Sequence, residues 1–263
     1  MLIRFIGVLR EIARGGLAGL IAGIVVGGLG GRLVMMLAAR LNPDATGRLT
    51  ENGEIVGAFT LNGTLALLLF GGAFAGFAAG VTWVVISPWV PLSGWRRWLL
   101  AAPLGISLGA FLLIHENNRD FQILNLDAVI VALLLALVGL VAVAVAWLDE
   151  KLDRRLPRAD RRPIAGLVAY GVIAGIGLLF VPVVLGLYFT SDGCGCGSPP
   201  VIVGWFLVAV GLVTVAWWAM RIARGRPDRP RLLMVAGRVG VTGAAFLGAA
   251  YLVPILVTIL GAA

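Results

Sequence analysis

The sequence predicts an all-α integral membrane protein with seven transmembrane helices, its N-terminus in the cytoplasm and its C-terminus outside. Of the 263 residues, 60% are hydrophobic and only 13% are charged, whereas soluble domains have about 45–50% apolar and about 25% charged residues. The apolar runs are about 17 to 27 residues long, which suits helices that need about 20 residues to cross a bilayer and not barrel strands of about 10. The arginines are concentrated in alternate connections between these runs.

The first 14 residues have an amphipathic pattern. Leu2, Ile6 and Leu9 recur at helical spacing, while Arg4 falls on the other side. We expect residues 1–14 to form an interfacial helix in the inner headgroup layer, followed by one seven-helix transmembrane domain over residues 15–263. Its spans are predicted at about 15–41, 62–86, 98–114, 128–148, 164–189, 201–220 and 239–261.

The orientation follows from the basic residues, because Lys and Arg in short loops stay on the cytoplasmic side. With the N-terminus inside, the cytoplasmic segments hold all of the 21 Lys and Arg residues except Arg32, Arg40, Arg48 and Arg119. Tryptophans gather near the same boundary, as interfacial indoles do: Trp83, Trp89, Trp95, Trp98, Trp147, Trp217 and Trp218. We therefore expect a multi-pass protein of the cell membrane with the lipid bilayer as its partner. The net charge of +8 reflects its loops, so no nucleic-acid partner is expected.

Glycines recur at every fourth position in the first two spans. They are Gly15, Gly19, Gly23, Gly27 and Gly31 in the first span, and Gly72, Gly76 and Gly80 in the second. Such rows, the pattern of a glycine zipper, let two helix backbones approach closely because no side chain separates them. The rows indicate tight packing within one subunit, or alternatively a homo-oligomer interface or a pore-lining face.

A short extracytoplasmic β-hairpin is predicted between the first two spans. The segment contains Glu51, Asn52, Gly53 and Glu54, and Asn-Gly suits a type I′ turn because both central positions need positive φ. The hairpin is either a passive connector or a lid over an outer-facing site.

Polar residues on the expected outer side form the best candidate ligand site. Arg32 interrupts the first span about 17 residues in, or roughly 26 Å along the helix. A charge at that depth either snorkels, forms a structural ion pair or meets a ligand. Its candidate partners are His115, Glu116, Asp120 and Asp127, although Asp127 also suits an ordinary helix N-cap.

Both cysteines, Cys194 and Cys196, are in the third outer loop. Their one-residue spacer would make a strained and easily reduced disulfide, and two thiols are also an incomplete site for a soft metal such as Cu(I). The pair is therefore structural or idle, a redox pair, or part of a metal site.

The sequence favours a non-enzymatic role without deciding it. A single histidine excludes a bis-histidine haem, and the only lysine, Lys151, lies in an inner loop rather than where a retinal Schiff base requires one. No Walker A or dinucleotide fingerprint is present, so no cofactor is expected.

Three functions remain open on the sequence. The leading hypothesis is binding or transport of a small solute, ion or lipid headgroup at the outer-facing polar site. The alternatives are a structural or accessory subunit that docks a membrane-complex partner through its glycine rows, and an extracytoplasmic thiol-redox or copper-handling protein.

Overall fold

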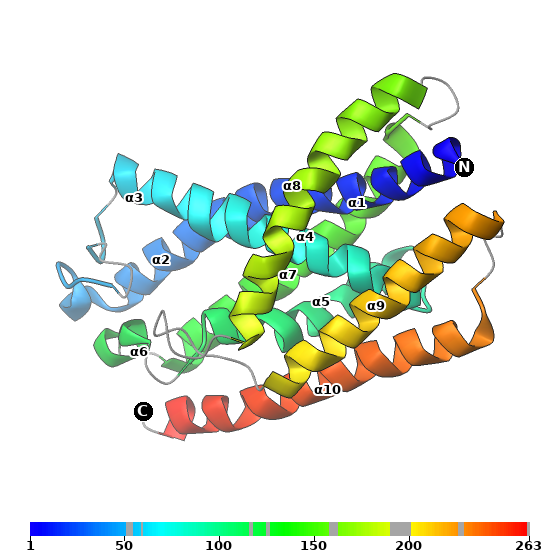
Figure 1. Cartoon of the computed structure of the whole chain (residues 1–263). Coiled ribbons are helices and arrows are strands. Elements are labelled where there is room, and N and C mark those ends of the chain that lie inside the picture. Colours follow the sequence, from blue (N-terminus) through cyan, green and yellow to red (C-terminus); the bar gives the residue numbers. More distant parts are fainter. Residues whose placement is uncertain are drawn as a thin grey trace.

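The computed structural model describes residues 1–50, 55–58, 60–115, 118–124, 127–157, 163–189, 201–225 and 229–261. In this part of the chain the secondary structure is helical and contains no strand (Figure 1). The prediction of an all-α membrane protein is therefore confirmed in its broad form.

Two of the long helices are built from several segments. The first contains α1 (Leu2–Ala22), a π-helical segment (Gly23–Gly28) and α2 (Leu29–Leu41). The second contains α3 (Leu61–Ala66), a π-helical segment (Leu67–Phe74), α4 (Ala75–Ile86) and a 3₁₀ turn (Ser87–Trp89). The later helices are α5 (Trp95–Gly109), α6 (Arg119–Ile123), α7 (Asp127–Arg155), α8 (Pro163–Phe189), α9 (Val201–Arg224) and α10 (Arg231–Gly261).

Six helices of the described chain are long and apolar enough to cross a membrane, where the sequence predicts seven spans. They cover Leu2–Leu41, Leu61–Trp89, Asp127–Arg155, Ile164–Phe189, Val201–Arg224 and Arg231–Gly261. The third expected span, 98–114, corresponds to α5, which has 15 residues and is followed by a 3₁₀ turn over Ala110–Leu112. The α-helix changes there to a 3₁₀ turn, before the polar stretch that begins at His115. By itself α5 is therefore shorter than a bilayer-spanning helix, which needs about 20 residues.

The first helix is continuous from Leu2 to Leu41 and has no break near residue 14. Ile6 and Ala13 are fully buried and form a small apolar cluster with Tyr170 of α8. The first 14 residues therefore have a packed face within the bundle, in addition to any contact with lipid headgroups.

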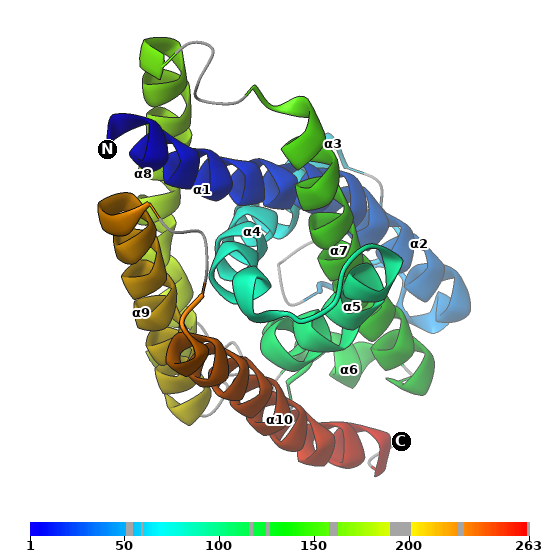
Figure 2. The ribbon, with the colours of Figure 1, turned by 90° about the vertical axis from the view of Figure 1, so that its right-hand side faces the viewer.

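The long helices form one bundle whose two ends differ in content. The N-terminus, the end of α7, the start of α8, the end of α9 and the start of α10 lie at one end, while the end of α2, α6 and the end of α10 lie at the other (Figure 1). We call these the arginine-rich end and the α6 end. Seen from the arginine-rich end, α4 and the start of α5 are central, with α1, α7, α9 and α10 around them (Figure 2).

The first two long helices approach each other closely at their glycines. A Cβ added at Gly19 would lie 2.3 Å from the carbonyl oxygen of Gly76, and one at Gly23 would lie 2.1 Å from that of Gly72. A Cβ at Gly80 would lie 2.4 Å from the carbonyl oxygen of Gly15. The approach loosens toward Gly31, where the nearest atom is a leucine methyl at 3.6 Å.

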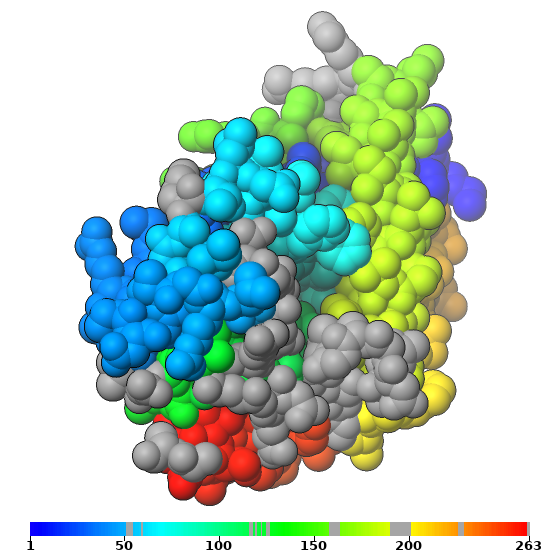
Figure 3. Space-filling model, turned by 90° about the vertical axis from the view of Figure 1, so that its left-hand side faces the viewer, coloured from blue at the N-terminus to red at the C-terminus, as the bar shows by residue number. Residues whose placement is uncertain are grey.

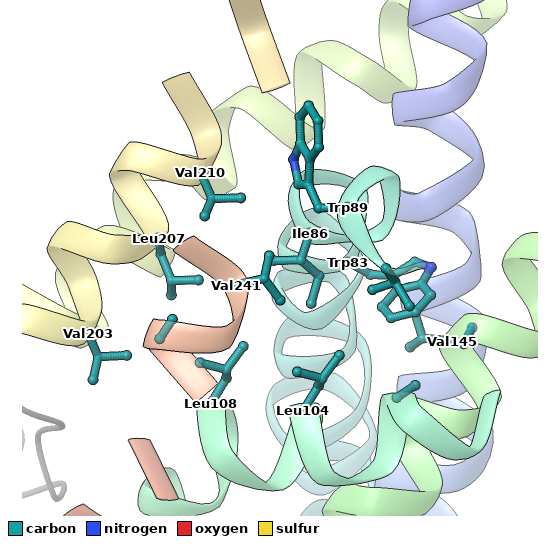
Figure 4. Close-up of a cluster of buried hydrophobic side chains, with 14 of the residues drawn as sticks. Trp83, Ile86, Trp89, Leu104, Leu108, Val145, Val203, Leu207, Val210 and Val241 are labelled. Atoms are coloured by element: carbon teal, nitrogen blue, oxygen red, sulfur yellow. The ribbon is translucent and has the colours of Figure 1, made fainter. Parts of the chain in front are cut away.

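The largest apolar core lies where α4, α5, α7, α9 and α10 meet. Figure 4 shows the side chains that converge there: Trp83, Ile86, Trp89, Leu104, Leu108, Val145, Val203, Leu207, Val210 and Val241. Outside this core many large apolar side chains are exposed, such as Leu178, Phe246 and Leu69. An outward-facing apolar surface of this kind is what a lipid environment requires.

The expected β-hairpin after α2 is not confirmed. The described residues contain one isolated antiparallel bridge, between Leu49 and Ile55, and the amide of Val56 donates to the carbonyl of Arg48 at 2.9 Å. The turn residues Glu51, Asn52, Gly53 and Glu54 lie outside the described residues. Figure 3 views the α6 end, with α2 in blue, α3 in cyan and the last turns of α10 in red.

Candidate ligand-binding site

A polar cavity of about 370 Å³ lies at the arginine-rich end of the bundle. Ligand pockets in proteins commonly measure about 300–1,000 Å³, so this volume suits a small molecule. Its walls come from α1, the α4–α5 connection, α5, α7, α9 and the residues before α10. The charged and aromatic side chains that line it are Glu11, Arg14, Arg97, Asp149, Trp217, Trp218 and Arg229.

The carboxylate of Asp149 anchors one wall of the cavity. It is 2% exposed, and its oxygens accept hydrogen bonds from Arg14 Nε at 2.6 Å and from Trp83 Nε1 at 3.2 Å. Arg14 also pairs with Asp153, one helical turn further along α7, at 2.5 Å. These bonds join α1 to α7 and α4, and they satisfy the negative charge of Asp149 from within the protein.

The second carboxylate of the cavity, Glu11, is also paired. It forms an ion pair with Arg221 of α9 at 2.8 Å, and the guanidinium of Arg221 lies 4.6 Å from the centre of the Trp217 ring. Arg229 lies 4.9 Å from the same ring centre and donates a hydrogen bond to the carbonyl of Pro88. Such positions of cations over an indole are favourable.

The positive charges of Arg97 and Arg229 have no carboxylate partner within ion-pair distance in the described part of the chain. Arg97 donates from Nη2 to the carbonyl of Ser87 at 3.0 Å and lies 5.2 Å from the centre of the Trp83 ring. The guanidinium stays protonated because arginine loses its proton only far above neutral pH, so a half-buried positive charge without a carboxylate partner lines the cavity.

Three buried N–H groups around the cavity also lack an acceptor among the described residues. They are Arg97 Nε, Trp217 Nε1 and Trp218 Nε1. Trp217 is only 6% exposed, so its indole N–H is removed from bulk water. These three atoms have essentially no accessible surface, so protein atoms cover them and they are not open to the cavity.

The structure places the described outer-site candidates at the α6 end, away from this cavity. Arg32 is 9% exposed, and its Nη2 donates to the carbonyl of Ala58 at 3.2 Å. His115 is buried at 4% exposure. The backbone amide of Asp120 donates to Oδ1 of Asn118, which caps α6.

The end of α2, the following connection, α6 and the start of α7 pack together through an apolar cluster that includes Ala39, Val56, Leu124 and Ile130. Asp127 begins α7, and its buried Oδ1 has no donor among the described residues. The polar candidates of the α6 end thus share one region, but Glu116 lies outside the described residues.

The thiol and metal candidates are not placed. Cys194 and Cys196 lie outside the described residues, and the described part of the chain holds no group of three or more His, Cys, Asp or Glu side chains that could bind a metal ion.

Sequence reasoning missed the cavity at the arginine-rich end because it counted the arginines only as markers of orientation. A usable signal was present: Glu11, Asp149 and Asp153 are acidic residues among the basic segments of that end, and Trp217 and Trp218 are adjacent. Acidic residues among basic segments are expected to form ion pairs with some of the arginines. The arginines that remain without an acidic partner are then candidates for ligand binding.

The long apolar helices and the polar cavity at one end define a multi-pass α-helical membrane protein. Comparison with known protein families, with curated proteins and with solved structures gave no match.

Proposed function

We propose that this protein binds or transports a small solute, ion or lipid headgroup, and that the ligand occupies the cavity at the arginine-rich end. The observation that carries the proposal is the pairing pattern of the cavity wall. Both carboxylates are satisfied by arginines of other helices, while Arg97 and Arg229, which also line the cavity, have no carboxylate within ion-pair distance among the described residues. Charged side chains that line a cavity without an opposite charge as partner are candidates for a functional site.

We also propose that the arginine-rich end faces the cytoplasm and that the chain crosses the cell membrane seven times. Two observations support the seventh crossing. The termini lie at opposite ends of the bundle (Figure 1), and α5 with its following 3₁₀ turn gives about 28 Å of helix at 1.5 and 2.0 Å per residue. This length is close to the hydrocarbon thickness of about 30 Å. The cavity would then open near the inner headgroups.

The cavity replaces the outer polar residues as the leading site. Arg32 uses one of its donors on a backbone carbonyl, which supports a structural role for this residue in joining α2 to the next connection. The glycine rows of the first two helices face each other within the chain, which favours ligand binding over an accessory subunit that needs these rows for a partner.

The test is the thermal stability of the detergent-purified protein against a panel of cations, anions, amino acids and lipids. A ligand at about 100 times its dissociation constant stabilises the folded state by about 2.7 kcal/mol, which corresponds to a rise of about 5–10 °C in Tm for a chain of this size. We expect the rise to disappear in Arg97→Gln and to persist in the matched variant Arg154→Gln. Arg154 is exposed, lies at the same end and pairs with Glu150 outside the cavity. A rise that survives Arg97→Gln would exclude this cavity as the site.

A further inference from the structure

We propose that an anionic phospholipid binds on the outer surface of the bundle, with its headgroup between Arg96 of α5 and Lys151 of α7 at the arginine-rich end. Both side chains are exposed, and neither lines the cavity described above. The site is therefore separate from the one in the proposed function. In the described part of the chain neither residue has a carboxylate within ion-pair distance.

The two basic residues lie at the same level because α5 and α7 pack side by side in opposite directions (Figure 2). A Cβ added at Gly105 would lie 2.4 Å from Cβ of Ala142, which fixes one point of contact between the helices. Nearer the start of α5 and the end of α7, Trp98 Nε1 donates to a carboxylate oxygen of Glu150 at 2.9 Å. The two basic residues are close neighbours of this second pair in the sequence, so both lie at the arginine-rich end of the helix pair.

Exposed residues form one row along each helix, because they recur at helical intervals. The rows are Trp95, Arg96 and Leu99 on α5, and Leu140, Trp147 and Lys151 on α7. At about 100° per residue, Leu99 lies about 120° around α5 from Gly105, which faces α7. Trp147 lies about 140° around α7 from Ala142, which faces α5, with the same sense of rotation along the chain. Because the helices run in opposite directions, the same sense places both rows on one side of the pair.

Each of the two basic residues lies over an exposed indole. The guanidinium of Arg96 is 5.6 Å from the centre of the Trp95 ring, and Nζ of Lys151 is 5.6 Å from the centre of the Trp147 ring. Trp95 is 60% exposed and Trp147 is 40% exposed. Exposed indoles of membrane proteins lie at the level of the lipid headgroups. The stacked cations are therefore held at the depth where a phospholipid carries its phosphate.

The charge of this surface selects an anionic headgroup. Glu150 borders the two rows, but its carboxylate pairs with Arg154 at 2.5 Å and accepts the hydrogen bond of Trp98. The positive charges of Arg96 and Lys151 are thus not balanced by a described carboxylate. A zwitterionic headgroup offsets its own phosphate with an ammonium group, whereas an anionic phospholipid brings a net negative charge to the two cations. Basic sites between transmembrane helices bind anionic headgroups in this way.

The apolar part of the surface indicates a lipid rather than a soluble anion or an acidic protein. Leu99 and Leu140 are each 58% exposed, and they lie in the same rows as the basic residues. Leu140 is about 17 Å along α7 from Lys151 at 1.5 Å per residue, so the row extends from the headgroup level toward the middle of the bilayer. An acyl chain that lies along this row covers apolar side chains while its headgroup contacts the cations.

The experiment is native mass spectrometry of the full chain in a neutral detergent, titrated with phosphatidylglycerol. The dissociation constant of the first bound lipid is the measured quantity. Phosphatidylcholine with the same acyl chains is the zwitterionic comparison, and glycerol 3-phosphate is the comparison without acyl chains. We expect phosphatidylglycerol to bind more tightly than either compound.

The variants remove the two cations and leave the indoles in place. A basic residue near the surface strengthens the binding of an anionic lipid by about 5-fold. We therefore expect Arg96→Gln and Lys151→Gln each to weaken the binding of phosphatidylglycerol by about 5-fold, and the double variant by about 25-fold. Arg224→Gln is the matched control, because Arg224 is exposed at the end of α9, across the same end of the bundle from α5 and α7 (Figure 2). Elution volume and helical circular dichroism establish that each variant is folded.

The outcomes separate a defined lipid site from a general attraction to charge. If Arg224→Gln weakens the binding as much as Arg96→Gln, the lipid follows the total charge of this end and the inference is wrong. Equal binding of phosphatidylglycerol to the double variant and to the unmodified protein also overturns it. Equally tight binding of phosphatidylcholine or of glycerol 3-phosphate removes the role of the charge or of the apolar row. If Arg97→Gln abolishes the binding instead, the lipid occupies the cavity, so this inference fails while the proposed function stands.

Discussion

Replacing Gly23 with alanine tests how closely the first two long helices are packed. Gly23 begins the π-helical segment of the first helix, and its added Cβ would lie 2.1 Å from the carbonyl oxygen of Gly72 and 2.5 Å from Cα of Gly76. Ordinary van der Waals contact begins at 3.4 Å, so the methyl group is about 1.3 Å too close. Both atoms it meets belong to the backbone, so no side-chain rotation can relieve the overlap.

The expected cost follows from this geometry. Overpacking a close-packed site costs about 1–3 kcal/mol, and we expect about 3 kcal/mol here because one whole helix must move. Alanine is itself a better helix former than glycine by roughly 0.5–1 kcal/mol. The net loss in the free energy of unfolding is therefore about 2 kcal/mol, or about 4–8 °C in Tm.

The matched control is Gly175→Ala in α8, where the added Cβ has no atom within 4 Å. This variant gains the helix propensity of alanine without the overlap, so we expect its Tm to be unchanged or slightly raised. Thermal unfolding of both variants in the same detergent, followed by circular dichroism at the helical band, compares them. Equal Tm values for Gly23→Ala and Gly175→Ala would refute the close approach of the two backbones.

Two further substitutions test the two ends of the bundle. Asp149→Asn removes the buried charge that pairs with Arg14. Breaking a buried ion pair costs about 3–5 kcal/mol. We expect a smaller loss of stability here, about 2 kcal/mol, because Arg14 keeps its second partner, Asp153. A Tm equal to that of the unmodified protein would show that the pair does not hold α1 to α7. Arg32→Met removes the donor to the carbonyl of Ala58 and should lower the stability by about 1–2 kcal/mol while ligand affinity stays the same. Loss of the ligand-induced rise in Tm would return the binding site to the α6 end.

The class of fold could be predicted from the sequence because lipid imposes a simple requirement. Each crossing needs a helix of predominantly apolar residues, and the runs that meet this requirement are visible without any knowledge of packing. The third run was the exception. Its residues are apolar over 98–114, and this pattern is the same for one continuous α-helix and for an α-helix that ends at Gly109 and is followed by a 3₁₀ turn over Ala110–Leu112.

Contacts between residues that are far apart in the sequence could not be predicted from the sequence pattern. The amphipathic pattern of residues 1–14 suggested an interfacial segment because its charged side would lie in the headgroup layer. In the structure Arg10 and Arg14 pair with Asp153 and Asp149 of α7, so these charges are satisfied inside the assembled bundle and the helix continues without a break. The π-helical segments Gly23–Gly28 and Leu67–Phe74 could not be foreseen either, since no residue pattern in them differs from that of an α-helix.

The cavity shows why counting arginines cannot separate those that are paired with carboxylates in the folded bundle from those that are not. The rule that basic residues stay inside acts on charge in the unfolded, inserting chain, and it is indifferent to what each arginine contacts afterwards. In the folded bundle Arg14 and Arg221 have carboxylates of other helices as partners, whereas Arg97 has a backbone carbonyl and an indole face. The partners on other helices, rather than the number of arginines, therefore distinguish Arg97 and Arg229, which line the cavity without a carboxylate partner among the described residues, from the paired arginines.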